Sequence, residues 1–284
     1  VDPVGEARRF VAAQRNYFDT LDQRAEALAE EIAGAGGAEG WLKARGTRVR
    51  FLPGEIMAGS VRRYDRHNEQ LLIDDALDGA SRAYQLAVQI AYTALRGEIS
   101  GIVRSAGLAS ETANGLVRRA WAGYGAAALL MPYAKFAAAV EARRYDIEAL
   151  SRQFGTSFEQ TAHRLTTLGR PGMERVPFFF IRVDAAGNVS KRLDGAGFPF
   201  AGHGGGCPLW SVHSVFSRPG EITTQWLELP DGERFFSIAR TVTAGGGGFG
   251  RPRIHRAIAL ACAAEHAARL TYAEGLDPKA AEAT

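Results

Sequence analysis

The sequence has 284 residues, 46% of them hydrophobic, and a formal net charge of +3. This length suits one large domain or two smaller ones with a substantial core, and so weak a positive charge does not by itself indicate a nucleic-acid surface. Two cysteines exclude a disulfide framework, and no run of about 20 apolar residues predicts a membrane span, so we expect a cytoplasmic protein without a membrane partner.

Residues 6–33 are rich in Ala, Glu, Arg and Gln and are predicted to form one long helix. Apolar residues on it follow a 3-4-3-4 spacing at Phe18, Leu21, Ala25, Leu28 and Ile32. This heptad seam is short. It therefore predicts either packing onto its own domain or a coiled coil with a second copy.

A second helix is predicted over residues 80–97. Val88, Gln89 and Tyr92 stand on it with the spacing of the zinc motif H-E-x-x-H, in which the two His bind the metal and the Glu is the general base. Val and Tyr do not replace imidazole, and Gln cannot accept a proton. The helix thus resembles a zinc-peptidase helix without its chemistry. The alternative is an ordinary buried amphipathic helix.

Residues 146–168 are predicted to form two short helices joined by a turn at Gly155. Such a motif can read DNA with its second helix. Here that helix offers only His163 and Arg164 as base readers, and its flanks are not basic. A structural hairpin is the better interpretation.

From residue 177 onward the sequence predicts strands. Arg182, Lys191, Arg192 and Arg240 alternate there with apolar residues. Such side chains bind phosphate or carboxylate groups, or else form a solvated sheet face. Trp210 is a candidate for stacking on a ligand, although core packing is more common for Trp.

A glycine-rich segment follows at His203-Gly204-Gly205-Gly206-Cys207. It is similar to an esterase oxyanion loop, but the sequence has no G-x-S-x-G elbow. Cys207 with His203 or His213 would form a nucleophile pair. The favoured interpretation is a turn at which the backbone of Gly204, Gly205 and Gly206 approaches a ligand.

A dense set of motifs from residue 129 onward points to one family. They are Leu-Leu-Met-Pro at 129–132, Phe-Gly-Thr-Ser-Phe-Glu at 154–159, His-Arg-Leu-Thr-Thr-Leu at 163–168, Arg-Pro-Gly at 170–172, Val-Pro-Phe-Phe-Phe-Ile-Arg-Val-Asp at 176–184, Gly-Asn-Val-Ser-Lys-Arg at 187–192, Cys-Pro-Leu-Trp at 207–210, Pro-Asp-Gly at 230–232 and Ala-Arg-Thr-Val at 239–242. The sequence resembles the short-chain fatty acyl-CoA-responsive transcriptional regulators of bacteria, of the propionate (methylcitrate cycle) type found in actinobacteria.

The resemblance implies an α+β fold, in which an α-rich, degenerate zinc-peptidase-like (ImmA/IrrE) domain precedes an α/β ligand-sensing domain with a mixed or antiparallel sheet. We expect a linker or oligomerisation helix at 1–33, the degenerate domain at 34–170 and the sensing domain at 171–284. The third zinc ligand of the peptidases corresponds to Trp121. All metal and base positions would then be lost.

By the same resemblance, the ligand is CoA or a short-chain acyl-CoA, with propionyl-CoA the first candidate. We expect Arg182, Lys191, Arg192 and Arg240 to contact it, with Gly204, Gly205, Gly206 and Trp210 lining the site. The other implied partners are a second copy, as homodimer or homotetramer, and promoter DNA, bound through an N-terminal helix–turn–helix domain that these 284 residues lack.

Members of the family also carry a Cys-rich tail that binds an iron–sulfur cluster. These residues do not include that tail. Cys207 and Cys262 could add ligands, but two thiols do not hold a cubane cluster. We therefore expect no metal in this chain and a cluster only in the full-length protein.

The main expectation is a regulator and not an enzyme. One alternative is a Cys-dependent acyl-CoA thioesterase or acyltransferase that uses Cys207 and a nearby His. A second is a metal-dependent peptidase with unrecognised ligands.

Overall fold

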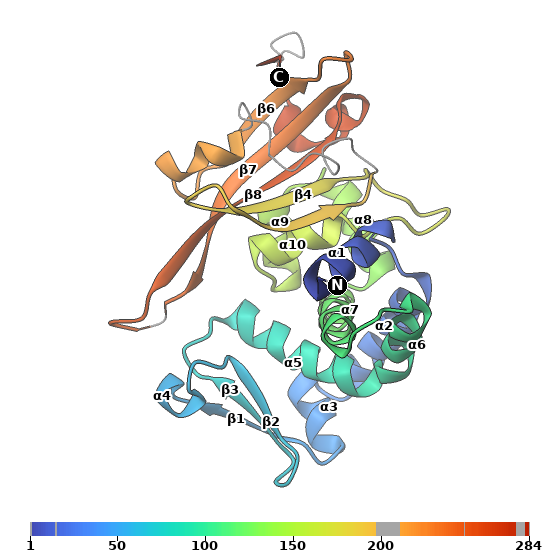
Figure 1. Ribbon diagram of the computed structural model, residues 1–284, viewed down its shortest axis with the longest axis vertical. Coiled ribbons are helices and arrows are strands. Elements are labelled where there is room, and N and C mark those ends of the chain that lie inside the picture. The colour runs from blue at the N-terminus through green and yellow to red at the C-terminus, as the bar shows by residue number, and fades with distance from the viewer. Residues whose placement is uncertain (1, 15, 197–210, 247, 277–281, 284) are drawn as a thin grey trace.

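The computed structural model describes residues 2–14, 16–196, 211–246, 248–276 and 282–283. It has a helix-rich N-terminal part with a small sheet and a C-terminal part with a larger sheet, which confirms the predicted α+β class (Figure 1). The helices are α1 (Pro3–Ala13), α2 (Asp19–Gly34), α3 (Ala38–Ala44), α4 (Gly54–Met57), α5 (Gly79–Ala94), α6 (Arg96–Ala106), α7 (Glu111–Leu130), α8 (Tyr133–Ala142), α9 (Ile147–Phe154) and α10 (Phe158–Leu165). The strands are β1 (Arg48–Leu52), β2 (Arg62–Asp65), β3 (Gln70–Asp74), β4 (Phe179–Asp184), β5 (Val189–Asp194), β6 (Thr223–Glu228), β7 (Arg234–Gly245), β8 (Arg253–Ala263) and β9 (Glu282–Ala283). Short 3-10 turns are η2 (Ser211–His213), η3 (Val215–Ser217), η4 (Ala264–Arg269) and η5 (Thr271–Ala273).

The prediction of one helix over residues 6–33 is wrong, because α1 and α2 are separate helices. Asn16 between them has a φ of 57°, and its side-chain amide donates to the Thr166 hydroxyl at 2.5 Å. A left-handed residue does not continue a right-handed helix. The seam residues of α2 are fully buried within the chain at Leu21, Ala25 and Leu28. The seam therefore packs onto its own domain.

Helix α7 lies at the centre of the N-terminal part and packs against α5. Small residues allow the close approach. A Cβ atom at Gly123 would lie 2.9 Å from the Tyr84 hydroxyl, and one at Gly125 would lie 2.9 Å from Leu95 Cδ1. Although α7 has 20 residues, no helix in the described part of the chain is long and apolar enough to cross a membrane.

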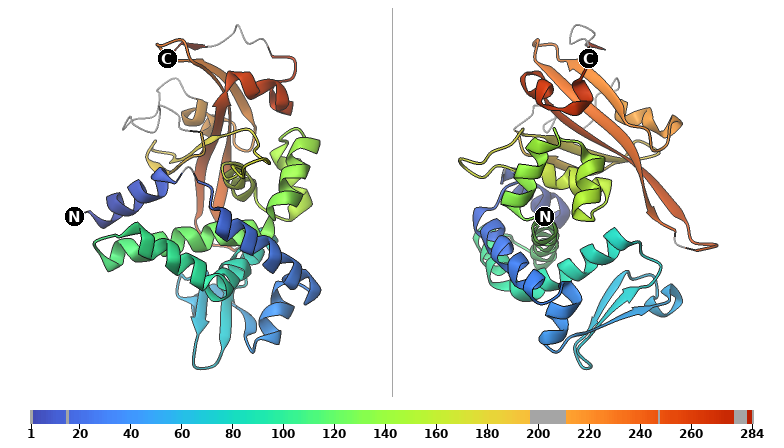
Figure 2. Two further views of the ribbon diagram at one scale, coloured as in Figure 1. Left: turned by 90° about the vertical axis from the view of Figure 1, so that its right-hand side faces the viewer. Right: turned by 180° about the vertical axis from the view of Figure 1, so that it is seen from behind.

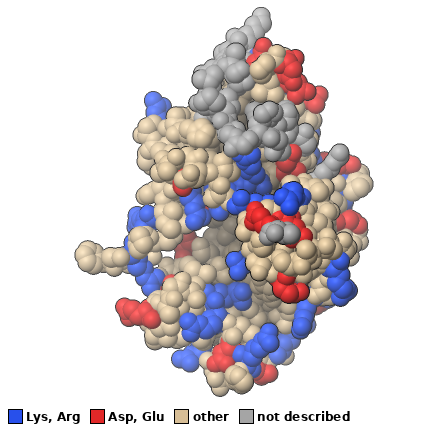
Figure 3. All heavy atoms as spheres, in the orientation of Figure 1, with Lys and Arg blue, Asp and Glu red and all other residues tan. Residues whose placement is uncertain are grey.

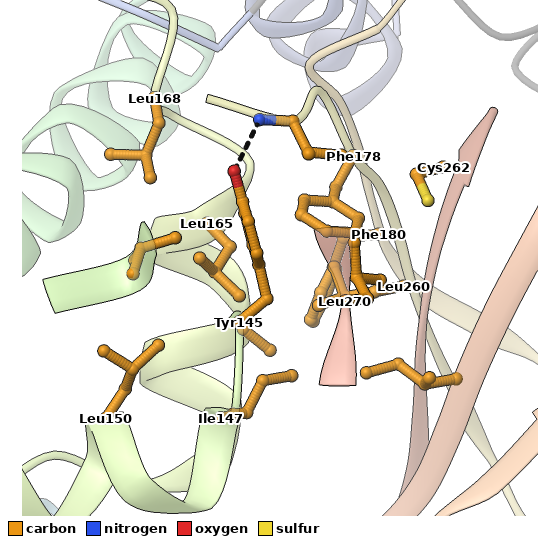
Figure 4. Packing of buried hydrophobic residues seen from close by; sticks show 14 of the residues in the cluster. Tyr145, Ile147, Leu150, Leu165, Leu168, Phe178, Phe180, Leu260, Cys262 and Leu270 are labelled. Carbon is orange, nitrogen blue, oxygen red and sulfur yellow. Dashed lines mark hydrogen bonds between the residues drawn. The ribbon is translucent and has the colours of Figure 1, made fainter. Parts of the chain in front are cut away.

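The larger sheet has the strand order β5-β4-β8-β7-β6-β9 and is mixed, since β6 and β9 are parallel and the other neighbours are antiparallel. Helices α8, α9 and α10 cover one face, and η2 and η3 lie on the other (Figure 2). Side chains alternate between the faces. Phe180 therefore packs toward helices α8, α9 and α10, and Ile181 packs toward η2 and η3. Figure 4 shows the helix-side core, where the Tyr145 hydroxyl accepts a hydrogen bond from Val176 N at 3.1 Å.

A buried ion pair joins α2 to α10. Arg164 donates to both carboxylate oxygens of Asp22 at 2.6 and 3.2 Å, and the two side chains are 1% and 0% exposed. Tyr124 of α7 donates a third hydrogen bond to the same carboxylate. Burial lowers the pKa of Arg164, but the Asp22 carboxylate outweighs burial and holds that pKa above its ordinary value. This network connects α2, α7 and α10.

The helix–turn–helix at 146–168 is a structural hairpin. Of the two candidate base readers, Arg164 is buried against Asp22, and the ring of His163 lies edge-on to Phe180 at 5.9 Å. Burial first, and then the nearby Lys191, lower the pKa of His163 well below its ordinary value. Neither side chain is presented to DNA.

The hairpin of β7 and β8 extends from the larger sheet toward the small one (Figure 1). At its tip Arg251 donates to both carboxylate oxygens of Asp74 on β3, at 3.1 and 3.3 Å. A Cβ at Gly54 would lie within 1.5 Å of the Arg251 guanidinium. A side chain at this position would therefore require the Arg251 guanidinium to shift. The domain boundary expected at residue 170 stays a prediction. Helices α8–α10 precede this boundary in the chain, yet they pack on the larger sheet, which follows it.

Candidate functional site

Three of the candidate cations lie in one row across the larger sheet. Lys191 on β5 is the register partner of Arg182 on β4, and Ile258 of β8 pairs with Arg182 on one side and Arg240 of β7 on the other. Directly paired residues share a face, so Lys191, Arg182 and Arg240 all point to the α9–α10 side. We call these three residues the cationic rung. It crosses three strand spacings, roughly 14 Å.

Carboxylates from the helical hairpin of α9 and α10 form ion pairs with the two arginines of the rung. Arg182 Nη1 donates to Glu159 of α10 at 2.6 Å, and its Nε donates to the Ser190 hydroxyl at 2.9 Å. Arg240 Nη1 donates to Glu148 of α9 at 3.1 Å. Both pairs are partly exposed, so each stabilises the fold only weakly. The Nε atom of Arg240 is buried and has no hydrogen-bond partner among the described residues, so this donor is unsatisfied.

Lys191 differs from its two neighbours, because its amine makes no hydrogen bond or ion pair with any residue that the structure describes. Burial, followed by the nearby positive charge of Arg182, lowers the pKa of Lys191 from 10.5 to about 8, against the attraction of Glu159. An amine kept in such surroundings destabilises the fold. Cations held in this way are typical of binding sites.

Replacing Lys191 by Met should stabilise the protein near neutral pH. Below about pH 8 the amine is charged in both folded and unfolded chains, so the folded state bears the full unfavourable burial. Between about pH 8 and 10.5 the unfolded chain binds more protons, so the stability of the wild type rises with pH in that window. Urea unfolding at about pH 7 should show Lys191→Met more stable by about 1–3 kcal/mol.

That gain should shrink as pH rises and vanish above about pH 10.5. The matched control is Lys43→Met, which replaces an exposed amine on α3 and should change the free energy of unfolding by less than about 0.5 kcal/mol. A Lys191→Met protein that is less stable than the wild type at neutral pH would mean that the amine has a stabilising partner.

An open groove adjoins the rung at Arg240. It has a volume of about 340 Å³ and is lined by Glu148, Ser151, Arg152, Phe158 and Arg240. The Arg240 guanidinium lies over the Phe158 ring at 4.6 Å. On the face of the molecule seen in Figure 3, the surface is hollowed between the β7–β8 arm and α5, and Lys and Arg side chains gather around that hollow. This distribution of charge favours an anionic ligand.

An arginine contacts the residues at the former zinc positions of α5. Arg62 of β2 donates to Gln89 Oε1 at 2.6 Å, and its guanidinium lies 5.3 Å from the centre of the Tyr92 ring. Burial lowers the pKa of Arg62, and no carboxylate is paired with it among the described residues. A cation thus lies beside Gln89 and Tyr92, two of the three motif positions on α5. Sequence reasoning missed Arg62, because the strand that carries it is far from α5 along the chain.

The residues at these positions do not fit a zinc ion. Val88 and Tyr92 offer no imidazole, and Trp121 is buried against the rings of Phe18 and Phe10, at 3.9 and 6.5 Å, on the side of α1 and α2. No group of three or more His, Cys, Asp or Glu side chains in the described ranges has a metal-binding arrangement. Peptide hydrolysis by metal therefore finds no support in this part of the chain.

The remaining candidate residues are Arg192, Cys262 and a glycine-rich segment that the structure does not describe. Arg192 pairs with Ile181 and so lies on the opposite face of the sheet. Gly204, Gly205, Gly206, Trp210, His203 and Cys207 lie outside the described residues. Cys262 is buried in β8, and burial raises the pKa of its thiol to about 12, which makes it a poor nucleophile or metal ligand.

Two family models match the chain in succession. Residues 42–166 match the IrrE N-terminal-like domain of the M78 peptidases. Residues 167–284 match the model described as the short-chain fatty acyl coenzyme A regulator, C-terminal. A solved structure described as a Mycobacterium tuberculosis transcriptional regulator is 37% identical and covers 99% of this chain and 89% of its own, with a TM-score of 0.91. The chain belongs to the family of short-chain fatty acyl-CoA regulators.

Curated members of this family include the HTH-type transcriptional regulator PrpR of Mycobacterium tuberculosis, which is 38% identical over 96% of this chain and 57% of its own length. The propionyl-CoA carboxylase regulator of Cereibacter sphaeroides is 37% identical over 98% of this chain and 60% of its own. The chain thus spans a little under two thirds of these relatives. The expected family is confirmed, and the curated relatives are named as regulators.

Proposed function

We propose that this chain is the ligand-sensing part of a transcriptional regulator of propionate metabolism and that it binds CoA or a short-chain acyl-CoA on the cationic rung. The observation that carries this proposal is the rung itself, with its unpaired amine at Lys191 and its unsatisfied donor at Arg240 Nε. CoA carries a diphosphate and a ribose phosphate, which guanidinium and ammonium groups recognise. Propionyl-CoA is our first candidate because a relative is named a propionyl-CoA carboxylase regulator.

The proposed mechanism is a population shift driven by competition for the rung arginines. Ligand phosphates would displace Glu159 from Arg182 and Glu148 from Arg240, which frees one carboxylate on each helix of the hairpin. Helix α10 carries both Glu159 and Arg164, and Arg164 holds Asp22 of α2. A shift of α10 would therefore reach the N-terminal helices. In the longer protein these would change the arrangement of subunits and of the helix–turn–helix domains on promoter DNA.

Calorimetric titration with CoA, propionyl-CoA and a longer acyl-CoA tests the binding, with light scattering to follow oligomeric state. We expect saturable binding of the CoA compounds without their turnover. Pantetheine is the matched control ligand. It lacks the phosphates, so it should bind at least about 100-fold more weakly, since each charge-assisted hydrogen bond contributes about 1.5–3 kcal/mol.

Equal affinity for pantetheine and CoA would contradict phosphate recognition by the rung. Steady release of free CoA from propionyl-CoA that is lost in a Cys207→Ala variant would instead favour the thioesterase alternative. The iron–sulfur cluster is proposed only for the full-length regulator. In the described residues Cys262 is buried in the sheet and offers no surface ligand.

A further inference from the structure

We infer that Lys191 is a site of covalent self-acylation, at which a bound short-chain acyl-CoA transfers its acyl group to the lysine amine. This inference rests on the proposed binding of acyl-CoA at the rung and extends it from a reversible contact to a chemical modification of the sensor.

The geometry places an amine without a carboxylate partner at one end of a row of phosphate-binding groups. Arg182 and Arg240 each have a carboxylate from the hairpin, whereas Lys191 has no hydrogen-bond or ion-pair partner in the described part of the chain. The rung spans roughly 14 Å, a length over which an extended pantetheine arm can separate a thioester from its diphosphate. A ligand whose phosphates lie at Arg240 would bring its thioester to the Lys191 end.

The surroundings of Lys191 favour the nucleophilic form of its amine. Facing it are Arg182 on β4 and Glu159 and His163 on α10. Burial and the Arg182 charge lower its pKa to about 8, with only Glu159 acting in the other direction. The His163 imidazole is neutral at pH 7, because its pKa lies well below the ordinary value. At pH 7 the Lys191 amine is mostly charged, but about a tenth of it is uncharged, roughly a few hundred times the uncharged fraction of an exposed lysine.

The transfer needs no reagent besides the acyl-CoA. The neutral Lys191 Nζ attacks the thioester carbonyl carbon and forms a C–N bond. The tetrahedral intermediate collapses with cleavage of the C–S bond, and the proton lost by the nitrogen ends on the departing thiolate. The products are an amide at Lys191 and free CoA thiol. The acylated side chain occupies the end of the rung that receives the thioester, so a second acyl-CoA would bind more weakly and the sensor would respond less to later ligand.

The test is incubation of the protein with propionyl-CoA at about pH 7 and about pH 9, followed by mass spectrometry of intact protein and peptides. Lys43 and Lys135 are exposed and serve as internal controls. We expect Lys191 to gain one propionyl group at least about tenfold faster than either control at about pH 7, with a smaller ratio at about pH 9. An excess of a propionyl-CoA thioether analogue, which cannot transfer its acyl group, should suppress the reaction at Lys191 only.

Calorimetry with the same thioether analogue, on the wild type and on a Lys191→Arg variant, separates this inference from the proposed function. If the analogue binds both proteins but Lys191 reacts no faster than Lys43, self-acylation is wrong while the proposed binding stands. If the analogue does not bind and lysines react uniformly, both proposals are wrong. Selective, analogue-sensitive modification of Lys191 that is absent in Lys191→Arg would establish the site.

Discussion

Asp22→Ala should destabilise the protein by about 3–5 kcal/mol, since it leaves the Arg164 guanidinium buried without a counter-charge. Arg164 is 1% exposed and donates two hydrogen bonds to the Asp22 carboxylate, to which Tyr124 also donates. Loss of this carboxylate removes three hydrogen bonds at once from the junction of α2, α7 and α10. The change is measured as the free energy of urea unfolding at neutral pH.

Two further variants show whether the unpaired charge is the cause. Glu39→Ala removes an exposed carboxylate on α3 and should change the free energy of unfolding by less than about 0.5 kcal/mol. The double change Asp22→Leu with Arg164→Met removes both charges and should be less destabilising than Asp22→Ala alone. An Asp22→Ala protein whose free energy of unfolding lies within about 1 kcal/mol of that of the wild type would show that the ion pair does not hold these helices together.

Arg182→Gln should weaken the binding of CoA by roughly 10- to 150-fold, the equivalent of about 1.5–3 kcal/mol for one charge-assisted contact. Arg182 is the central cation of the described row, between Lys191 and Ile258. The matched control is Arg192→Gln. Arg192 is one residue from Lys191 on the same strand but lies on the opposite face of the sheet. Calorimetry at one salt concentration should show that Arg192→Gln binds CoA with an affinity within about threefold of that of the wild type.

These two variants decide which face of the sheet binds the ligand. A larger loss in Arg192→Gln than in Arg182→Gln would place CoA on the face of η2 and η3, away from the rung. Circular dichroism and unfolding curves for both variants serve as controls for folding. The Arg182–Glu159 pair is partly exposed, so its loss should affect stability little.

The family resemblance implied the α+β class, and the alternation of apolar and charged residues predicted strands from residue 177 onward. Strand periodicity also assigns Arg182 and Arg240 each to one face of its own strand. It does not give the register between strands. Only the pairing of Lys191, Arg182, Ile258 and Arg240 brings the three cations into one row and separates Arg192 from them.

Other features depend on contacts between residues far apart in the chain. Asn16, at the break between α1 and α2, donates to Thr166, 150 residues away, and the local helical pattern over residues 6–33 does not contain this contact. The sequence offered Arg164 as one of two candidate base readers, and it gave no sign that Asp22, 142 residues away, is the partner of Arg164. Arg62 has no sequence signal that connects it to Gln89. Such long-range partners are not encoded in any local window of sequence.

Hydrogen–deuterium exchange with and without propionyl-CoA tests the central claim. The claim is that acyl-CoA binds across the cationic rung and breaks the ion pairs of Glu159 with Arg182 and of Glu148 with Arg240. We predict slower exchange in β4 and β5 at the rung and altered exchange in α9 and α10, which carry Glu148 and Glu159. Binding by calorimetry together with protection confined to the opposite face of the sheet, at η2 and η3, would contradict the account.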